Sequence, residues 1–597
     1  MSPANDGAPA GAWEVRGTWY RLHGRAASQV ALLDDTGDRR WAELRMLAAV
    51  DRVDVRDETL AVDGPVVEAM GDGSTRLTWA LRSTAWDAVR VVILARPDRL
   101  AVHAEVDGAG RLGDVTLLGG RLVTPRANGS VMSGAWFESI VSGGPADPGR
   151  IVRHATESAD IGVASGSEPG RGAWFFTPGP FVYAVSRSAA GDPLVPPPGR
   201  WLGLGLRVGR GDAGFTSFGY RALDRGFAFT LDYDGRTRVD GTWRSPAVVL
   251  REAADPYVAI ADWREDLEES GAVETPELRP VPDWWRQPMF CGWGAQAALA
   301  HEAGLPMSAA PGNATQAAYD GFLAELETRG IRPGTIVVDD KWQRAYGTNE
   351  PDAVKWPDLR GWIARRHDAG RRVLLWVKAW DPEGLPDEAC ILTASGARLA
   401  VDPESTAGKA ALRTATRRIL DPADMDADGI KLDFTARTPT GRAITRDGTS
   451  WGVDLLARLL DIIADEARAT KRDALVIGHA PNPLTAPALG MLRLNDALRL
   501  DDPRPLADLV AQMRHRAAIV RAACPGVPID TDDWCAPDRA GWRAYAEAKV
   551  ELGVPALYYT TRLDLSGEPL DDDDAALIRR TWAAYRERER LAERSTG

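Results

Sequence analysis

The sequence predicts a multidomain protein of the β plus α/β class, in which an N-terminal β-sandwich-like domain (residues 1–275) precedes a (β/α)8 TIM barrel (residues 276–597). Three observations lead to this prediction. The chain has 597 residues, which is more than one ordinary domain holds. Up to about residue 270, short alternating apolar runs are broken by Gly, Asp and Pro. From about residue 280, short apolar runs alternate with helical stretches, which is typical of βαβ units.

The N-terminal runs read as strands of a sheet that is buried on one face. Examples are "TRLTWAL" (75–81), "FVYAVS" (181–186) and "GFAFTLDYDG" (226–235). Alternation of apolar and polar residues places the apolar ones on a single face. Many short strands at such spacing, with little helical periodicity between them, favour a β-sandwich.

Eight apolar runs in the second half predict the strands of the barrel. In chain order they are "MFCGWG" (289–294), "GTIVVDD" (334–340), "RVLLWVKAW" (372–380), "GIKLDF" (429–434), "ALVIGHA" (474–480), "MLRLND" (491–496), "VPIDTDD" (527–533) and "ALYYTT" (556–561). Stretches with helical periodicity lie between them, for example 315–330 and 452–470, and one more, 571–595, ends the chain. The fifth connection, 481–490, is short and predicts a loop with one helical turn.

Composition and charge argue against several classes of protein. The formal net charge is −13, whereas a nucleic-acid partner requires a basic surface. The N-terminal stretch 1–15 has no features of a secretory signal, and no run of 18 apolar residues predicts a membrane span. The four cysteines (Cys291, Cys390, Cys524 and Cys535) follow no zinc spacing and are too few for a disulfide framework. We therefore expect a cytoplasmic protein that binds neither nucleic acid nor membranes.

Carboxylates follow several of the predicted barrel strands. In such barrels the active site is built at the C-terminal ends of the strands. A single aspartate there often caps the next helix, but four strand ends out of eight carry one. These residues are Asp339 and Asp340 on strand 2, Asp433 on strand 4, Asp496 on strand 6, and Asp530, Asp532 and Asp533 on strand 7. Trp293 on strand 1 and Trp376 and Lys378 on strand 3 are expected at the same end.

Clustered carboxylates in a barrel suit three chemistries: a divalent-metal site, metal-assisted proton abstraction, and glycoside hydrolysis. Metal sites in barrels commonly include histidines, yet the chain has seven, and only His479 lies at a predicted strand end. The chain also has 22 tryptophans, and flat indole rings stack well on sugars. The pattern therefore favours a sugar substrate and no metal or organic cofactor, with a metal-dependent lyase or isomerase as a rival.

Four stretches resemble the α-galactosidases of glycoside hydrolase clan D, nearest to family 36 of the α-galactosidase and raffinose-synthase superfamily. "VVDDKWQ" (337–343) is similar to the "DDGWQ" strand end of that family, and "GIKLDF" matches its Lys-x-Asp nucleophile strand. The segments 355–377 and 477–496 resemble the passages that lead to the third strand and to the acid/base strand. The resemblance covers about residues 285–535 and agrees with a β-rich domain ahead of the barrel.

The resemblance implies roles for two catalytic carboxylates. Asp433 would be the nucleophile that forms a covalent glycosyl-enzyme. Asp496 would be the acid/base, although it follows Arg493 by three residues where the family has four. Asp532 and Asp502 therefore stay open as alternatives for this role.

The resemblance also implies a set of substrate-binding residues. Lys431 would hold substrate hydroxyls and keep Asp433 ionised. Trp342 and Trp376 would provide walls that stack on the sugar ring. The remaining residues expected to contact the substrate are Asp339, Asp340, Arg493 and Asp532. Lys341 replaces a glycine of the family, which leaves room for an acidic or otherwise substituted sugar.

The predicted function is that of a retaining α-glycosidase, similar to α-galactosidases, which hydrolyses a terminal α-linked sugar through a covalent glycosyl-aspartate intermediate. An α-transglycosidase that uses a sugar acceptor and a non-catalytic sugar-binding barrel are the alternatives. The expected partner is a small glycoside or oligosaccharide. Members of the resembled family often assemble, so a homo-oligomer is compatible with this prediction.

Overall fold

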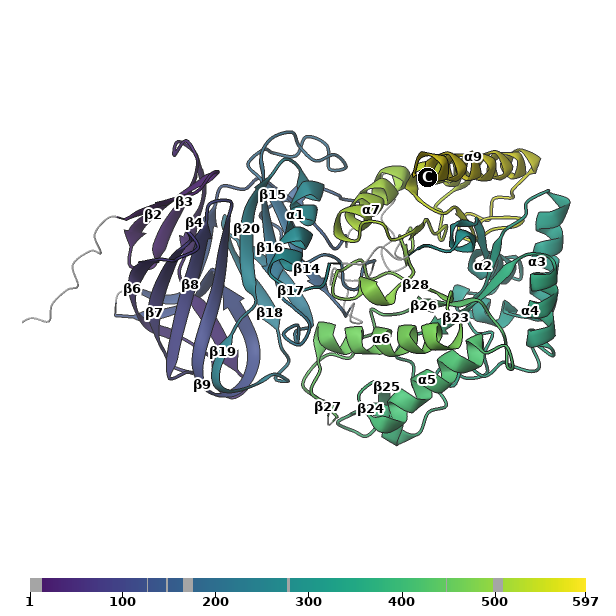
Figure 1. The fold of residues 1–597 in the computed structure, drawn as a ribbon, viewed down its shortest axis with the longest axis horizontal. Coiled ribbons are helices and arrows are strands. Elements are labelled where there is room, and N and C mark those ends of the chain that lie inside the picture. Colours follow the sequence, from purple (N-terminus) through teal and green to yellow (C-terminus); the bar gives the residue numbers. More distant parts are fainter. Residues whose placement is uncertain are drawn as a thin grey trace, which may run out of the picture.

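The structure is a computed structural model that describes residues 13–125, 127–145, 149–164, 175–275, 280–446, 448–497 and 508–596. A β-rich N-terminal part and a barrel surrounded by helices lie side by side along the long axis of the molecule (Figure 1). This arrangement confirms the predicted change from β to α/β structure along the chain. The sandwich packing and the boundary at residue 275 stay predictions.

The N-terminal part contains twenty strands among the residues described, and nearly all of their pairings are antiparallel. The long strand β9 pairs with β5, β8, β18, β19 and β20 and so ties the others together. The strands are β1 (Glu14–Arg16), β2 (Tyr20–Ala26), β3 (Gln29–Asp34), β4 (Arg40–Arg45), β5 (Ala48–Arg52), β6 (Thr59–Ala69), β7 (Thr75–Ser83), β8 (Ala88–Arg96), β9 (Arg99–Leu117), β10 (Gly119–Thr124), β11 (Ala127–Ala135), β12 (Ser139–Ser142), β13 (Arg153–His154), β14 (Ala159–Gly162), β15 (Val182–Ser186), β16 (Trp201–Arg207), β17 (Ser217–Leu223), β18 (Gly226–Asp232), β19 (Arg238–Arg244) and β20 (Ala247–Ala253).

Aromatic side chains from neighbouring strands fill the core of this part. Phe229 on β18 is fully buried, whereas the adjacent Thr230 is only partly buried, as period-two alternation predicts. The ring of Phe229 stacks on Phe218 of β17, with centroids 5.2 Å apart. Tyr183 of β15 lies 5.3 Å from Phe218. Helix α1 (Pro256–Glu269) follows β20 and packs on β16 through Trp263, whose indole N–H donates to the Leu206 carbonyl.

All eight apolar runs of the second half form strands of one parallel sheet. In chain order these are β21 (Met289–Cys291), β22 (Thr335–Val338), β23 (Arg372–Lys378), β26 (Gly429–Asp433), β28 (Leu475–Gly478), β29 (Met491–Arg493), β30 (Ile529–Asp530) and β31 (Ala556–Leu557). A parallel bridge from Asp530 to Val554, which lies just before β31, closes the ring. The predicted barrel is therefore confirmed.

Helices surround the sheet. They are α2 (Trp293–Glu302), α3 (Gln316–Thr328), α4 (Leu359–Asp368), α5 (Thr406–Leu420), α6 (Gly452–Thr470), α7 (Leu509–Ala523), α8 (Arg539–Leu552) and α9 (Asp572–Thr596). Helix α6 shows why they form, since Val453, Leu456, Leu460, Ile463 and Ala467 recur at helical spacing and are all buried. The fifth connection contains only the 3-10 turn η4 (Ala486–Ala488), as predicted.

The sequence prediction missed a small antiparallel sheet beside the barrel. It consists of β24 (Cys390–Thr393), β25 (Arg398–Val401) and β27 (Ile444–Thr445). Three further 3-10 turns, η1 (Asp283–Arg286), η2 (Met307–Asn313) and η3 (Asp387–Ala389), lie in other connections. Strands this short carry too little alternation to stand out from a loop.

Asp533, one of the carboxylates after strand 7, belongs to the framework of the barrel. It is buried and forms an ion pair with Lys549 of α8. It also accepts hydrogen bonds from the Tyr558 backbone N–H and the Trp542 indole. Asp533 thus joins the seventh strand to the eighth unit, where the ring closes.

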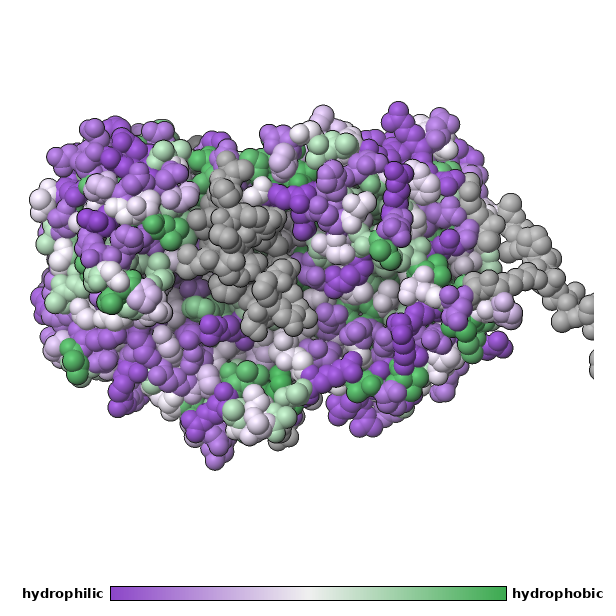
Figure 2. Space-filling view, turned by 180° about the vertical axis from the view of Figure 1, so that it is seen from behind, coloured by the Kyte–Doolittle hydropathy of each residue, from purple (hydrophilic) through white to green (hydrophobic). Residues whose placement is uncertain are grey.

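The surface carries mainly hydrophilic side chains. Figure 2 shows them across most of one face, with hydrophobic residues in small separate patches. This pattern is ordinary for a globular protein. Among the residues that the structure describes, no helix combines the length and apolar character needed to cross a membrane.

Candidate active site

The C-terminal ends of the barrel strands, which we call the mouth, contain unusual backbone conformations. Five residues there that are not glycine have left-handed φ angles: Lys341 (72°), Trp380 (71°), Phe434 (61°), Asn495 (65°) and Asp532 (55°). Each follows a barrel strand by one to three residues. Such conformations cost free energy and gather where function requires a particular side-chain direction. These conformations therefore indicate a functional site at the mouth.

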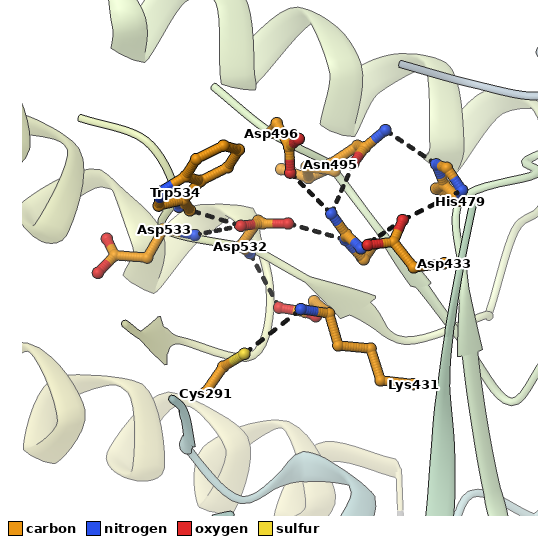
Figure 3. Close-up of polar contacts among 12 residues, drawn as sticks. Cys291, Lys431, Asp433, His479, Asn495, Asp496, Asp532, Asp533 and Trp534 are labelled. Carbon is orange, nitrogen blue, oxygen red and sulfur yellow. Dashed lines mark hydrogen bonds and ion pairs between the residues drawn. The ribbon is translucent and has the colours of Figure 1, made fainter. Parts of the chain in front are cut away.

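Arg493 of β29 is the centre of the polar cluster in the mouth. Figure 3 labels its partners Asp433, Asn495, Asp496 and Asp532. Its side chain is almost fully buried. Its Nε donates to Asp532 at 2.8 Å, and its Nη2 donates to Asn495 at 2.6 Å and to Asp496 at 2.9 Å. Its Nη1 lies 3.3 Å from Asp433 Oδ1 and has no hydrogen-bond partner among the described residues. One guanidinium therefore joins carboxylates from strands 4, 6 and 7.

Asp433 is held in the ionised form. Its two oxygens accept hydrogen bonds from the Phe434 backbone N–H at 2.9 Å and from the Trp376 indole at 3.2 Å. Burial alone would raise the pKa of Asp433. Neighbouring cations, above all Arg493, instead hold that pKa well below its usual range. The side chain keeps 22% of its surface exposed, so it faces the mouth.

Asp496 has the opposite protonation state. Burial raises the pKa of Asp496 to about 8, because the opposing effect of Arg493 is offset by Asp532 and Asp433. The carboxyl is therefore protonated at neutral pH, and 19% of the side chain is exposed. An exposed carboxylic acid opposite an ionised carboxylate is the pairing expected of an acid and a nucleophile.

Asp532 differs from Asp496 in both protonation state and exposure. Its side chain is fully enclosed, and it accepts hydrogen bonds from the backbone N–H groups of Asp533 and Trp534 as well as from Arg493. Burial opposes ionisation, yet Arg493 and these N–H groups lower the pKa of Asp532. It is an ionised anchor for Arg493. Asp502, the third acid/base alternative, lies outside the described residues.

Lys431 reaches Asp339 and Cys291, although the resemblance implied that it keeps Asp433 ionised. Its Nζ lies 2.7 Å from Asp339 Oδ2 and 3.3 Å from Cys291 Sγ, in the buried base of the mouth. Burial lowers the pKa of Lys431, but the ion pair with Asp339 raises it overall. The long side chain extends from strand 4 towards strands 1 and 2, so the cation in contact with Asp433 is Arg493 instead.

The two tryptophans expected to stack on a sugar have little exposed ring surface. Trp342 is fully buried, and its indole donates to the Trp376 carbonyl at 2.7 Å. The left-handed conformation of Lys341 precedes this inward turn. A ring with no exposed face cannot stack on a sugar, so we leave Trp342 out of the proposed site. Trp376 is also buried, and its indole N–H orients Asp433.

Asp340 and its neighbours form a second polar group at the mouth. Burial raises the pKa of Asp340 to about 6, and its Oδ1 accepts a hydrogen bond from Tyr346 at 2.8 Å. Lys341 forms an ion pair with Glu383 and lies 3.7 Å from the centre of the Tyr346 ring. The extra cation at position 341 is therefore balanced by a carboxylate. Tyr346 was missed because a tyrosine in a loop has no distinguishing pattern.

His479 and Asn495 also line the cluster, and no sequence motif indicated a role for Asn495. Asn495 Nδ2 donates to His479 Nδ1 at 2.8 Å, and His479 Nε2 lies 2.8 Å from the Thr435 hydroxyl. Burial lowers the pKa of His479 to about 4, so the ring is neutral. His479 is a hydrogen-bonding residue in this structure. No cluster of three or more His, Cys, Asp or Glu side chains suited to a metal ion occurs within the described part of the chain.

The protonation states predict different stabilities for two variants. Asp532→Asn removes an ionised partner of Arg493 and should lower the free energy of unfolding at neutral pH by about 1.5–3 kcal/mol. Asp496→Asn should cost much less, because Asp496 is already protonated. Denaturant unfolding of both variants measures the difference.

The pH dependence of the same experiment provides the control. Because folding raises the pKa of Asp496 to about 8, the wild type loses stability as pH rises from the ordinary carboxyl pKa of about 4 to about 8, whereas asparagine has no proton to lose. The Asp496→Asn variant should therefore gain stability relative to the wild type across that interval and keep this gain above it. Equal losses in both variants at neutral pH, without this gain, would contradict the assignment.

The structure is similar to solved glycosidases at very low sequence identity. A GH31 family sulfoquinovosidase from E. rectale in complex with an aza-sugar inhibitor aligns with a TM-score of 0.56 and 11% identity, over 96% of this chain and 82% of that one. A cycloalternan-degrading enzyme from Trueperella pyogenes in complex with cycloalternan aligns with a TM-score of 0.50 and 13% identity, over 96% and 72%. An α-galactosidase from Lactobacillus brevis gives 0.47 and 12%, over 96% and 83%. Neither a family model nor a curated protein matches the sequence. The likenesses to the sulfoquinovosidase and the cycloalternan-degrading enzyme show a shared fold.

Proposed function

We propose that the protein is a retaining α-glycosidase, similar to α-galactosidases, that hydrolyses a terminal α-linked sugar through a covalent glycosyl-aspartate. The observation that carries this proposal is that the carboxyl groups of Asp433 and Asp496 both contact Arg493. Asp433 is ionised and Asp496 is protonated at the same pH. Retaining glycosidases require one carboxylate as nucleophile and one carboxylic acid as proton donor.

The proposed reaction has two steps. In the first, Asp433 attacks the anomeric carbon, the bond to the leaving oxygen breaks, and that oxygen takes the proton of Asp496. In the second, the Asp496 carboxylate takes a proton from water while the water oxygen attacks the anomeric carbon. The ester bond to Asp433 then breaks, and both residues return to their starting states.

Arg493 suits this reaction because it contacts both carboxyl groups. The first step removes the negative charge from Asp433 and creates one on Asp496. Both groups lie within 3.3 Å of the same guanidinium, so in addition to the ionised Asp532 the cation faces one anion before the step and one after it. A preorganised cation of this kind stabilises developing charge without rearrangement.

The remaining polar side chains in the mouth suit a sugar. Asp339, Asp340 and Lys431 offer hydrogen-bond acceptors and donors at the ends of strands 2 and 4. Each side chain is largely buried, as expected of groups that bind a ligand in a pocket. The sulfoquinovosidase and the cycloalternan-degrading enzyme act on glycosides with this fold, which supports the choice of substrate class.

The nucleophile assignment predicts that Asp433→Asn abolishes turnover. A screen of aryl α-glycosides, including galactosides, glucosides, xylosides, arabinopyranosides and glycosides of acidic sugars, first identifies the substrate. The variant should then lower kcat by roughly 10⁴-fold or more while its circular dichroism stays unchanged. Asp428→Asn is the matched control, because Asp428 is a buried aspartate next to the opposite end of β26. Full activity of Asp433→Asn would contradict the proposal.

The acid/base assignment predicts a distinct signature for Asp496→Ala. Activity on glycosides with poor leaving groups should fall by roughly 10²–10⁴-fold, with a smaller loss for activated aryl glycosides. Azide should restore turnover and yield a glycosyl azide of retained configuration. In the wild type, kcat/KM should decline above about pH 8 as Asp496 loses its proton, and the variant should lack this decline. If Asp532→Ala shows the rescue instead, the assignment to Asp496 is wrong.

A further inference from the structure

A short segment of the N-terminal part, residues 175–180, reaches the mouth of the barrel. Asn495 Nδ2 donates to the Phe175 carbonyl at 2.8 Å. The Thr177 backbone N–H donates to the His479 carbonyl at 3.1 Å. Asn482 Nδ2 donates to the Gly179 carbonyl at 2.8 Å. The N-terminal part is therefore hydrogen-bonded to the ends of strands 5 and 6, next to the candidate catalytic groups.

The side-chain amide of Asn495 has one favourable orientation. Its Oδ1 accepts from Arg493, and its Nδ2 donates to the Phe175 carbonyl and to His479 Nδ1. Rotating the amide by half a turn would place its oxygen against the Phe175 carbonyl and its NH₂ against a guanidinium. A buried acceptor that faces another acceptor, or a donor that faces another donor, costs free energy. The Phe175 carbonyl thus helps to keep Oδ1 directed at Arg493.

A hydrogen-bonded chain continues from the amide back to the N-terminal part. Because His479 Nδ1 accepts from Asn495, the proton of the neutral ring lies on Nε2. Nε2 then donates to the Thr435 hydroxyl, which is hydrogen-bonded to the Thr177 hydroxyl. Both threonines are buried. The chain therefore begins and ends on the N-terminal segment.

Arg516 of α7 secures the backbone of the same loop. Its Nη1 donates to the carbonyls of Leu494, Asn495 and Asp496 at 2.9, 3.1 and 2.7 Å. Its guanidinium lies 3.8 Å from the centre of the Phe175 ring, which covers it. The loop that carries Asp496 is held from the barrel side by Arg516 and from the N-terminal side by Phe175.

We propose that Asn495 is a positioning residue that holds Arg493 between Asp433 and Asp496, and that the N-terminal segment holds Asn495 through the Phe175 carbonyl and Thr177. The left-handed backbone at position 495 suits asparagine, which tolerates that conformation. The effect of Asn495 on catalysis rests on the proposed function. The hydrogen bonds that position Arg493 do not depend on any substrate.

The inference predicts the direction of change when the amide is removed. The other charged or titratable groups near Asp433 and Asp496 are Arg493, Lys431, Asp532, His479, Asp340 and Arg516. Freeing Arg493 weakens its attraction to both carboxylates, which raises the pKa of each. Both limbs of the pH profile of kcat/KM should then move to higher pH.

Asn495→Gly is the test variant, because glycine accepts the left-handed backbone without strain. Both limbs should rise by about half a pH unit or more. Asn482→Ala is the matched control: it removes another buried asparagine that donates to the same segment of the N-terminal part, and among the described residues no hydrogen bond joins Asn482 to Arg493. It should leave the limbs in place. Unmoved limbs in Asn495→Gly, or equal shifts in both variants, would overturn the inference.

The pH dependence of unfolding measures the same change in pKa without requiring enzymatic turnover. Raising the folded-state pKa of Asp496 further above about 8 lowers stability at alkaline pH, so Asn495→Gly should be destabilised relative to the wild type more at about pH 9 than at about pH 4. The loss in Asn482→Ala should be equal at both. If the wild type hydrolyses no glycoside, the proposed function fails, yet this comparison still decides the positioning role. Parallel losses for the two variants would refute it.

Thr177→Val covers the case in which Asn495→Gly does not fold. The change removes only the hydroxyl at the N-terminal end of the chain and keeps the shape of the side chain. The limbs and the pH dependence of stability should move in the same direction by a smaller amount. A Thr177→Val profile identical to that of the wild type would then overturn the inference.

Discussion

The ion pairs of Arg493 are the interaction on which the candidate site depends. The guanidinium is almost fully buried, so it needs carboxylates, and it contacts three of them from different strands. Their different surroundings give them different protonation states. The enclosed Asp532 stays ionised as an anchor, Asp433 stays ionised at the mouth, and Asp496 keeps its proton. A barrel places these strand ends together, but the buried cation makes the three carboxyl groups chemically distinct.

Much of the architecture follows from periodicity in the sequence. All eight barrel strands were predictable because each is a short apolar run and helical stretches separate most of them, and the strand ends then indicated where Asp433, Asp496 and Asp339 would gather. The strands β24, β25 and β27 were not predictable, since two to four residues carry little pattern. The direction of Lys431 was also hidden, because alternation gives the face of a strand and not the neighbour that a long side chain reaches.

Other features of the site depend on burial, which a single sequence does not reveal. Asp496 and Asp532 both follow barrel strands, and only their exposure and hydrogen bonds separate a candidate acid from an anchor. Trp342 matches a family motif, yet it lies in the core. Asn495 has no motif at all, and its contacts include a carbonyl more than 300 residues earlier in the chain. The N-terminal part is thus connected to the same cluster that organises the mouth, which links the docking of the two parts to the geometry of Arg493.

If Asp433 is the carboxylate that bonds to the sugar, the covalent glycosyl-enzyme can be trapped on it. A fluorinated α-glycosyl fluoride, made from the sugar that the screen identifies, slows the second step and allows the glycosyl-enzyme to accumulate. Peptide mass spectrometry then locates the added mass. We expect one sugar on the peptide that contains Asp433. A sugar on another carboxylate, or turnover that inverts the anomeric configuration without an adduct, would contradict this assignment.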